Sequence, residues 1–431
     1  MSKSIPQLVD HLFRHEAGKL VAVLTKVFGA QNLNLAEDVV QDSLVEAISQ
    51  WQFKGIPDDP PAWLFRVAKN KALNILTRNN YKRKYASAIA RLPPSELTTA
   101  PDLEYLFSDQ EIRDDQLRMI FTCCHPAISP DSQIALALKT LCGFSISEIS
   151  SAFLTSEENV NRRLKRARQS IRDARVPFEI PGGKDLDIRL NTVLETIYLI
   201  FNEGYSASKG DALIRYELCE EAIRLAQMVA ANESIRHKEN VHALLALMFL
   251  NASRFKARQD SEGHLLTMAE QDRSLWDAQM RGIGLSHLAK ASKNDGISIY
   301  YILAAISAHY CTASDYGSTD WKSILSLYND LILLDNSPLI YLNRAVAIAK
   351  VNGTGEALAE LQRIKDDPAL HSYYLFYSTQ AEFHLQENDY DNASVSFEKA
   401  IQLVPLPSLK VLFEKKLDQC REKIISRHVP F

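Results

Sequence analysis

The sequence predicts an all-α protein built from several helical domains. Apolar residues recur at three- and four-residue intervals along much of the chain, which is the spacing of one buried helix face. Helix-start signals precede several of these segments, and a repeat of 36 residues near the C-terminus indicates stacked helix pairs. With 431 residues, 46% of them hydrophobic, the chain is too long for one core, and about three folded domains are expected.

The net charge of −4 conceals a difference between the two parts of the chain. Residues 1–175 contain 23 Lys and Arg against 20 Asp and Glu, whereas residues 176–431 contain 26 against 33. The N-terminal part, at +3, is therefore the candidate for binding a polyanion. The C-terminal part, at −7, is expected to meet proteins or small molecules.

Cysteine usage and hydropathy also predict the cellular compartment of the protein. The six cysteines show no CxxC pair and no regular spacing, which is typical of reduced thiols in a cytosolic protein. No apolar signal core precedes the first domain, and no apolar run approaches the ~18–20 residues of a membrane span. We therefore expect a cytoplasmic protein without a membrane partner.

Residues 1–91 are predicted to form a first helical domain. Its first helix is expected over Leu8–Phe28, and its second helix opens at Asn34, with Glu37 completing a capping box. The face opposite the apolar stripe of the second helix carries Glu37, Asp38, Gln41, Asp42 and Glu46. The helix dipole is enough to explain the first two acids. Asp42 and Glu46 lie further along, so a protein-docking surface is possible there.

A third helix is predicted from Pro60 onward, with Asp59 as its N-cap. Residues 62–91 contain eight basic residues and no acid. A basic face with an exposed aromatic ring suits opened DNA, because cations hold phosphate and a ring stacks on an unpaired base. Trp63 would supply the ring; the alternative is that Trp63 packs under the preceding loop.

Residues 92–116 are rich in acids and prolines and are predicted to be a linker, and residues 117–175 a second small domain. Within it, Gly143–Asp173 indicates two short helices joined by a tight turn, with capping boxes at Ser145–Glu148 and Thr155–Glu158. The second helix has an apolar stripe formed by Val160, Leu164, Ala167 and Ile171. Its other face carries Arg and Asn, which suits a DNA major groove. A solvated charged helix is the simpler alternative.

The Cys123-Cys124-His125 segment is the single metal-like cluster in the sequence. Adjacent cysteines cannot easily both reach one tetrahedral zinc together with the next residue, and no second ligand pair lies nearby. We expect buried packing at a helix end there, with no metal and no cofactor.

The remaining residues divide into a helical extension domain, 176–290, and repeats, 291–431. The polar turn Asn202–Tyr205 is expected either to line a pocket or to be a helix C-cap, with Gly204 left-handed. The repeats follow the tetratricopeptide (TPR) pattern of small, aromatic, small and proline positions. One copy has Ala381, Ala393, Phe397, Ala400 and Pro405, and a weaker copy has Ala345, Ala357, Leu361, Ile364 and Pro368. Residues 301–338 are a possible third copy.

LAEDVVQDSLVEAISQW, PPAWLFRVAKNKALNILTR and the helix-turn-helix resemble regions 2 and 4 of sigma-70-type RNA polymerase sigma factors. The layout is similar to the extracytoplasmic-function (ECF) group, and FTCCHPAISPDSQIALALKTLCGF resembles the subgroup with a long C-terminal extension, group 42. Asn74 departs from the family, which commonly has an acid there.

The resemblance implies partners and site residues. Core RNA polymerase would be bound through its β′ clamp and β subunit, with Asp38, Gln41, Asp42 and Glu46 on the clamp. The −10 promoter element would be opened and held by Trp63, Arg66, Lys69, Asn70, Lys71 and Arg78. The −35 element would be read by Ser156, Glu158, Asn159, Arg162, Arg163 and Arg166.

No catalytic constellation is present in the sequence, so we expect a sigma factor and not an enzyme. Two alternatives stay open: a helix-turn-helix regulator of duplex DNA without a sigma role, and a TPR scaffold. The covalent linkage and the charge contrast further suggest that the extension regulates the sigma regions in cis. Its ligand would be a protein or a small molecule.

Overall fold

The computed structural model describes residues 5–87, 108–153, 155–205, 214–261, 266–293, 297–404 and 407–428. Within these ranges the chain forms helices and no β-strand, which confirms the all-α prediction. It divides into two compact units, residues 1–200 and residues 201–431. None of the described helices combines the length and apolarity that crossing a membrane requires. The finer domain boundaries stay predictions.

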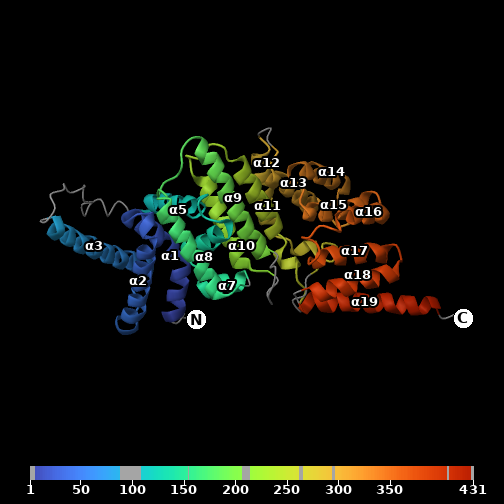
Figure 1. The fold of residues 1–431 in the computed structure, drawn as a ribbon, viewed down its shortest axis with the longest axis horizontal. Helices are drawn as coiled ribbons and strands as arrows, with labels where there is room; N and C mark the ends of the chain where they lie inside the picture. Colours follow the sequence, from blue (N-terminus) through green and yellow to red (C-terminus); the bar gives the residue numbers. More distant parts are fainter. Residues whose placement is uncertain are drawn as a thin grey trace. The chain divides into compact units, whose positions relative to one another are not determined.

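The N-terminal domain contains α1 (Ile5–Phe28), η1 (Ala30–Asn32), α2 (Leu33–Lys54) and α3 (Pro60–Ser87). Helix α2 packs against both α1 and α3 (Figure 1). The predicted N-cap of α3 is confirmed, because the amide of Ala62 donates to Asp59 Oδ1 at 2.9 Å. The predicted cap of α2 is wrong. The helix begins one residue before Asn34, at the end of the η1 turn, so no capping box forms there.

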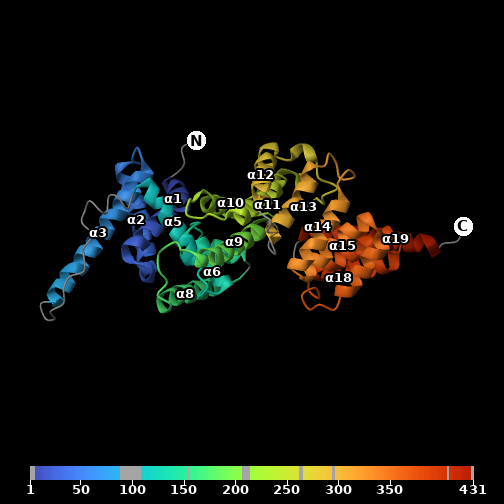
Figure 2. The ribbon, with the colours of Figure 1, turned by 90° about the horizontal axis from the view of Figure 1, so that it is seen from above.

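The helix-turn-helix domain contains α5 (Asp109–Cys123), α6 (Pro130–Thr140), α7 (Ile146–Ala152) and α8 (Glu157–Asp173). Helices α6 and α8 lie side by side (Figure 2). The capping box of Ser145 and Glu148 is confirmed. The N-cap of α8 is Ser156, whose side chain accepts from the Asn159 amide, and not Thr155 as predicted. All four residues of the predicted apolar stripe of α8 are buried.

The acidic segment before this domain is only partly a linker. Helix α5 begins at Asp109, and Ile112, Asp115 and Gln116 within it are buried. The abundance of acids and prolines predicts a linker over the whole of this segment. Asp115 is instead paired with Lys26 of α1 and with Arg118. Long-range ion pairing of this kind leaves no local signal in the sequence.

Helix α9 (Lys184–Tyr205) follows the helix-turn-helix domain, and its residues up to Ile200 belong to the first unit. The predicted turn at Asn202–Tyr205 is wrong, because these residues continue the helix. Position 204 requires glycine because the start of the next helix packs too closely against it to leave room for a side chain. A Cβ at this position would lie 2.7 Å from Cys219 Sγ and 2.9 Å from the Arg215 carbonyl oxygen.

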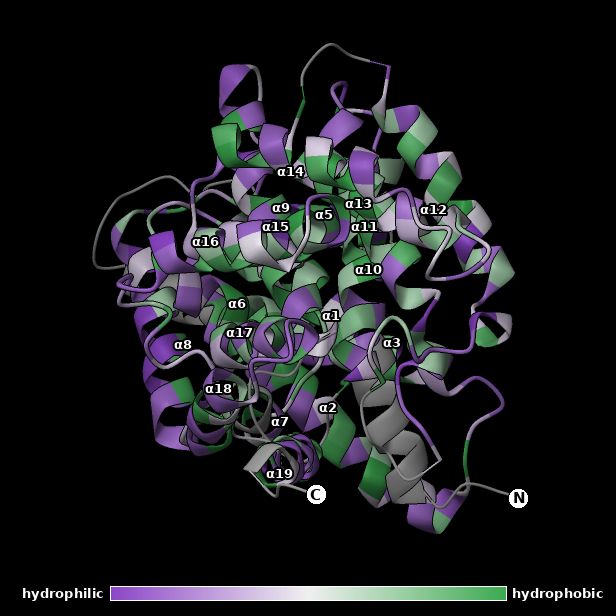
Figure 3. Ribbon diagram, turned by 90° about the vertical axis from the view of Figure 1, so that its right-hand side faces the viewer, coloured by the Kyte–Doolittle hydropathy of each residue, from purple (hydrophilic) through white to green (hydrophobic). Residues whose placement is uncertain are grey.

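The second unit begins with α10 (Tyr216–Ala231), α11 (Glu239–Ala252), η2 (Phe255–Ala257), η3 (Arg273–Leu275) and α12 (Ala278–Ala291). Helix α11 contacts α10, α12 and α13 (Ile299–Thr312). Ten of its 14 residues are buried, and the helix is predominantly hydrophobic (Figure 3). It is therefore the centre of this part of the core.

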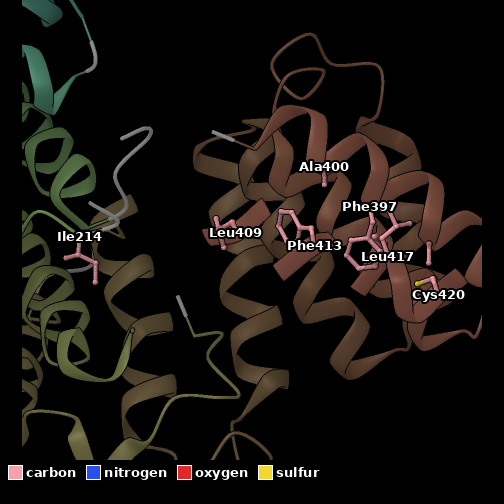
Figure 4. Close-up of a cluster of buried hydrophobic side chains, with 9 residues drawn as sticks. Ile214, Phe397, Ala400, Leu409, Phe413, Leu417 and Cys420 are labelled. Carbon is pink, nitrogen blue, oxygen red and sulfur yellow. The ribbon is translucent and has the colours of Figure 1, made fainter. Parts of the chain in front are cut away.

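The rest of the second unit consists of helix pairs. They are α13 with α14 (Trp321–Leu334), α15 (Pro338–Val351) with α16 (Thr354–Ile364), and α17 (Tyr374–Gln386) with α18 (Tyr390–Leu403). Helix α19 (Pro407–His428) covers α18, and Phe397, Phe413 and Leu417 gather between them (Figure 4). The small residues that define the repeats, such as Ala345 and Ala381, are fully buried. Pro405 lies outside the described residues.

Candidate nucleic-acid interface

One face of α8 is free to meet a ligand, and it carries the residues predicted for the −35 element. Ser156, Glu158, Arg162 and Arg166 are exposed, and Asn159 and Arg163 are half-buried. Arg162 Nη2 donates to Asn159 Oδ1, and Arg163 Nη2 lies 3.0 Å from Asp131 Oδ2 of α6. The helix therefore presents a row of guanidinium groups, two of which are already oriented by neighbours.

The residues predicted for polymerase lie together on the outer face of α2. Asp38, Gln41 and Asp42 are exposed, while Glu46 is half-buried. Glu46 Oε2 is 2.8 Å from Lys71 Nζ of α3, and Glu46 Oε1 accepts from Gln50. A residue predicted for polymerase is thus bound to a residue predicted for the −10 element. For Glu46 to bind polymerase or Lys71 to bind DNA, the Glu46–Lys71 ion pair must either break or accept the new partner as well.

Helix α3 carries the residues predicted for the −10 element along one exposed side. Arg66, Asn70 and Arg78 are exposed, and Lys69 and Trp63 are half-buried. The Trp63 ring packs edge-on against Trp51 at the end of α2, with 5.2 Å between ring centroids. Trp63 is therefore neither fully exposed nor buried under the loop. It is held in place by a second aromatic ring and keeps part of its surface accessible.

Glu37 does not lie on the exposed polar face of α2, as the sequence predicts, but is directed into the protein. It is buried, and its Oε2 accepts from Arg168 Nη2 of α8 at 2.6 Å. Burial raises the pKa of Glu37, while Arg168 and Lys139 oppose that shift. The apolar stripe of α2 flanks Glu37 with Ala36 and Val40, and that position is the signal that could have identified it. This ion pair joins the N-terminal domain to the helix-turn-helix domain.

A second ionic cluster joins the same two domains. Lys26 of α1 bonds Glu111 of α5, and its Nζ lies 3.6 Å from Asp115 Oδ1. Arg118 pairs with both acids. Burial raises the pKa of Asp115 to about 6 despite these cations. Alongside this cluster α1 packs against α5 and α6, and Gly18 is so close to Leu141 that a Cβ would lie 2.3 Å from its carbonyl oxygen.

The Cys123-Cys124-His125 segment contacts the start of the extension. Both cysteines are buried, and burial raises the pKa of the Cys124 thiol to about 12. Arg189 of α9 bonds the Phe121 carbonyl and lies over the Phe121 ring, 5.8 Å from its centroid. Thr196 donates to Gln133 Oε1 at 3.3 Å. Among the described residues no group of three His, Cys, Asp or Glu could hold a metal ion.

Comparison with known proteins places these domains in families. Residues 12–81 match sigma-70 region 2, and residues 118–171 match sigma-70 region 4. The chain belongs to the sigma-70 family. Residues 189–292 match a family of unknown function, DUF6596. The ECF RNA polymerase sigma factor SigG of two Mycobacterium tuberculosis strains, CDC 1551 and H37Rv, is 25% identical over 159 residues, covering 33% of this chain and 43% of SigG.

The similarity extends through the whole chain in another relative. The uncharacterized protein R00370 of Rhizobium meliloti is 34% identical over 409 residues, which cover 93% of this chain and 94% of that protein. No solved structure matches the chain. The protein is thus an alternative sigma factor of ECF type that acts in transcription initiation and binds core RNA polymerase and promoter DNA. Its membership of group 42 stays a prediction.

Proposed function

We propose that this sigma factor divides promoter recognition between the exposed faces of three helices. The outer face of α2 binds the β′ clamp of core polymerase through Asp38, Gln41, Asp42 and Glu46. Helix α3 and the loop before it open the −10 element, with Trp63 stacking on an unpaired base. The first turns of α8 read the −35 element in the major groove, and the β subunit completes the polymerase contacts.

The exposed guanidinium row of α8 is the observation that carries this proposal. Arg162 and Arg166 are exposed on a helix whose opposite side is buried, so they can reach DNA without unfolding the domain. Arg bonds guanine bidentately or holds phosphate, and Asn reads adenine. The row therefore supplies both positioning and sequence readout.

The test is transcription in vitro with bacterial core polymerase on a library of promoter fragments. Run-off product that depends on this chain supports the proposal and yields the promoter sequence. Binding to duplex DNA without any run-off product would favour a regulator without a sigma role. If neither binding nor product is found, a scaffold role becomes the better explanation.

We further propose that the extension regulates transcription in cis through α9. Arg189 is 8% exposed and its partners are the carbonyl and the ring of Phe121. Leu190, Val193, Leu194 and Ile197 of α9 are buried in the same unit as the helix-turn-helix domain. A displacement of α9 would therefore alter the packing of the helix-turn-helix domain, which carries the proposed −35 contacts. The extension's ligand, a protein or a small molecule, would act through this helix.

A further inference from the structure

The second unit contains a cavity whose walls carry two arginines. The cavity has a volume of about 530 Å³, which is within the range of small-molecule sites in proteins. Arg273 of η3 and Arg281 of α12 line it, and hydroxyl groups come from Ser274, Thr312 and Ser314. All of these residues lie within one compact unit. The cavity is therefore large enough for a small molecule, and its walls are cationic and polar.

The guanidinium groups of Arg273 and Arg281 face the end of α13. Arg273 Nη1 donates to the carbonyl oxygens of Tyr310 and Ala313 at 2.8 and 2.7 Å, and Arg281 Nη1 donates to that of Cys311 at 3.4 Å. Within the described residues, the bonds of both groups go to carbonyl oxygens and none goes to a carboxylate. A helix end carries roughly half a negative charge. Capping α13 therefore leaves most of the charge of the two arginines uncompensated.

The acid that influences Arg273 is already engaged elsewhere. Burial lowers the pKa of Arg273, and Asp315 partly opposes that shift. The Asp315 carboxylate accepts from the Ser318 amide at 2.8 Å and from the Ser314 hydroxyl at 3.1 Å. A guanidinium group stays charged in proteins. The cavity thus keeps a surplus of positive charge that an anion could neutralise.

Two buried donors beside the cavity lack a hydrogen-bond partner. Among the described residues, Arg273 Nη2 and Trp276 Nε1 are buried and unpaired, and Trp276 lines the cavity as Arg273 does. The indole is only 5% exposed and contacts two cations, because Arg273 Cζ and Arg254 Cζ lie 4.6 and 5.6 Å from its ring centroid. Unsatisfied buried donors are rare in native proteins and call for a partner. An acceptor bound in the cavity would supply it.

We propose that this cavity, called the arginine cavity below, binds a phosphate monoester of a hydroxylated small molecule, such as a sugar phosphate. A phosphate monoester carries about −1.5 to −2 charges at pH 7, which matches two guanidinium groups. A carboxylate pairs best with two nitrogens of one arginine, but Arg273 Nη1 is occupied by carbonyl oxygens. Three oxygens on one phosphorus accept single bonds from several donors at once. The hydroxyl groups of the cavity walls suit the polar remainder of the molecule.

The arginine cavity is connected to the end of α9 by a short segment of the second unit. Arg254 and Arg258 flank η2. Arg254 contacts Trp276 at the cavity wall, and Arg258 bonds the Tyr205 carbonyl oxygen and lies 3.8 Å from the centroid of the Tyr205 ring. A compound in the cavity would thus act on the helix through which regulation in cis is proposed above. Its regulatory role rests on that proposal, whereas its binding does not.

Isothermal titration calorimetry on the full chain, at constant ionic strength, tests the binding. The titrants are ribose 5-phosphate, inorganic phosphate, citrate and ribose. We expect ribose 5-phosphate to bind, inorganic phosphate to bind more weakly, and ribose to give no binding heat. Absence of binding by both phosphate compounds, or tighter binding of citrate, would overturn the proposal. Equal affinity for the two phosphate compounds would assign the cavity to free phosphate and overturn the monoester.

Arg281→Gln tests whether the anion binds in this cavity. The Arg281 bond to the Cys311 carbonyl is long, at 3.4 Å, so the fold should persist. We expect ribose 5-phosphate to bind about tenfold more weakly or worse, because a charged hydrogen bond is lost. Arg281→Lys, which keeps the charge without the planar group, should lose less. Arg236→Gln, at an exposed position between α10 and α11, is the matched control and should bind as wild type does.

Equal affinity of wild type and Arg281→Gln would show that the anion binds elsewhere and would exclude the arginine cavity. Circular dichroism verifies that each variant is folded. The titration needs no polymerase, so its outcome does not depend on the sigma function.

Run-off transcription with and without ribose 5-phosphate then tests the regulatory part. A change in run-off yield with wild type that is absent with Arg281→Gln supports it. Binding that leaves the run-off yield unchanged excludes the regulatory part and leaves the site standing. Absence of run-off from a wild-type chain that binds ribose 5-phosphate overturns the promoter and polymerase contacts proposed above, and not the site.

Discussion

At the scale of single residues, Arg162 is the most informative position on the −35 surface. It is exposed near the start of α8 and oriented by Asn159. We expect Arg162→Ala to weaken binding to the selected −35 sequence by about 1–3 kcal/mol, because a bidentate base contact is lost. Arg172→Ala in the last turn of the same helix is the control and should change binding little. An equal loss on all DNA sequences would indicate a phosphate contact instead.

Asp115 gives a residue-scale prediction about pH. Burial raises the pKa of Asp115 from its ordinary 3.8 to about 6, so the folded state binds the proton more tightly than the unfolded state. Its contribution to the free energy of unfolding therefore grows as the pH falls from 7 towards 4. Between pH 7 and pH 5 wild type should gain about 1 kcal/mol relative to Asp115→Asn. Urea unfolding at both pH values measures this, and parallel changes in the two proteins would contradict it.

At the scale of elements, α12 contains a matched pair of glycines. A Cβ on Gly284 would lie 2.8 Å from Leu250 Cγ and 3.1 Å from Leu250 N of α11, whereas a Cβ on Gly282 meets nothing within 4 Å. Gly284→Ala should therefore destabilise the protein by about 1–3 kcal/mol through overpacking. Gly282→Ala should stabilise it by up to about 1 kcal/mol, because alanine favours a helix. Thermal unfolding distinguishes the two, and equal shifts would argue against close packing of α11 on α12.

The elements themselves were largely predictable from the sequence, because helical periodicity and capping residues act locally. The stripe of α8, the box at Ser145 and the cap at Asp59 all formed as expected. The errors have non-local causes. Asp115 and Glu37 are buried because cations from distant helices reach them, and no spacing rule reports such a partner. The same holds for the candidate site. Its exposed helix faces were predictable, but the ion pairs of Glu46 with Lys71 and of Arg163 with Asp131 were not.

At the scale of the whole molecule, the two promoter-binding domains and the start of the extension form one unit. The match to DUF6596 begins at residue 189, inside that unit. The start of the DUF6596 match, at residue 189, therefore differs from the boundary between the two compact units, which follows residue 200. The extension domain is not simply appended after region 4, since α9 supplies buried residues to the same compact unit. A cut at residue 175, which composition favoured, separates α9 from this unit.

Two shortened chains separate the effect of α9 from that of the remaining extension. A chain ending at Tyr205 keeps all of α9, and we expect it to unfold cooperatively and to bind the selected promoter. A chain ending at Arg175 loses Arg189 and Thr196, which exposes the apolar surface around Phe121 and leaves Gln133 without one partner. Its thermal midpoint should be lower, and its run-off yield should differ from that of the full chain.

Regulation in cis would be excluded if the chain ending at Arg175 equalled the full chain in both run-off yield and promoter binding. A change that appears only between the full chain and the one ending at Tyr205 would place the regulatory effect in the second unit and not in α9.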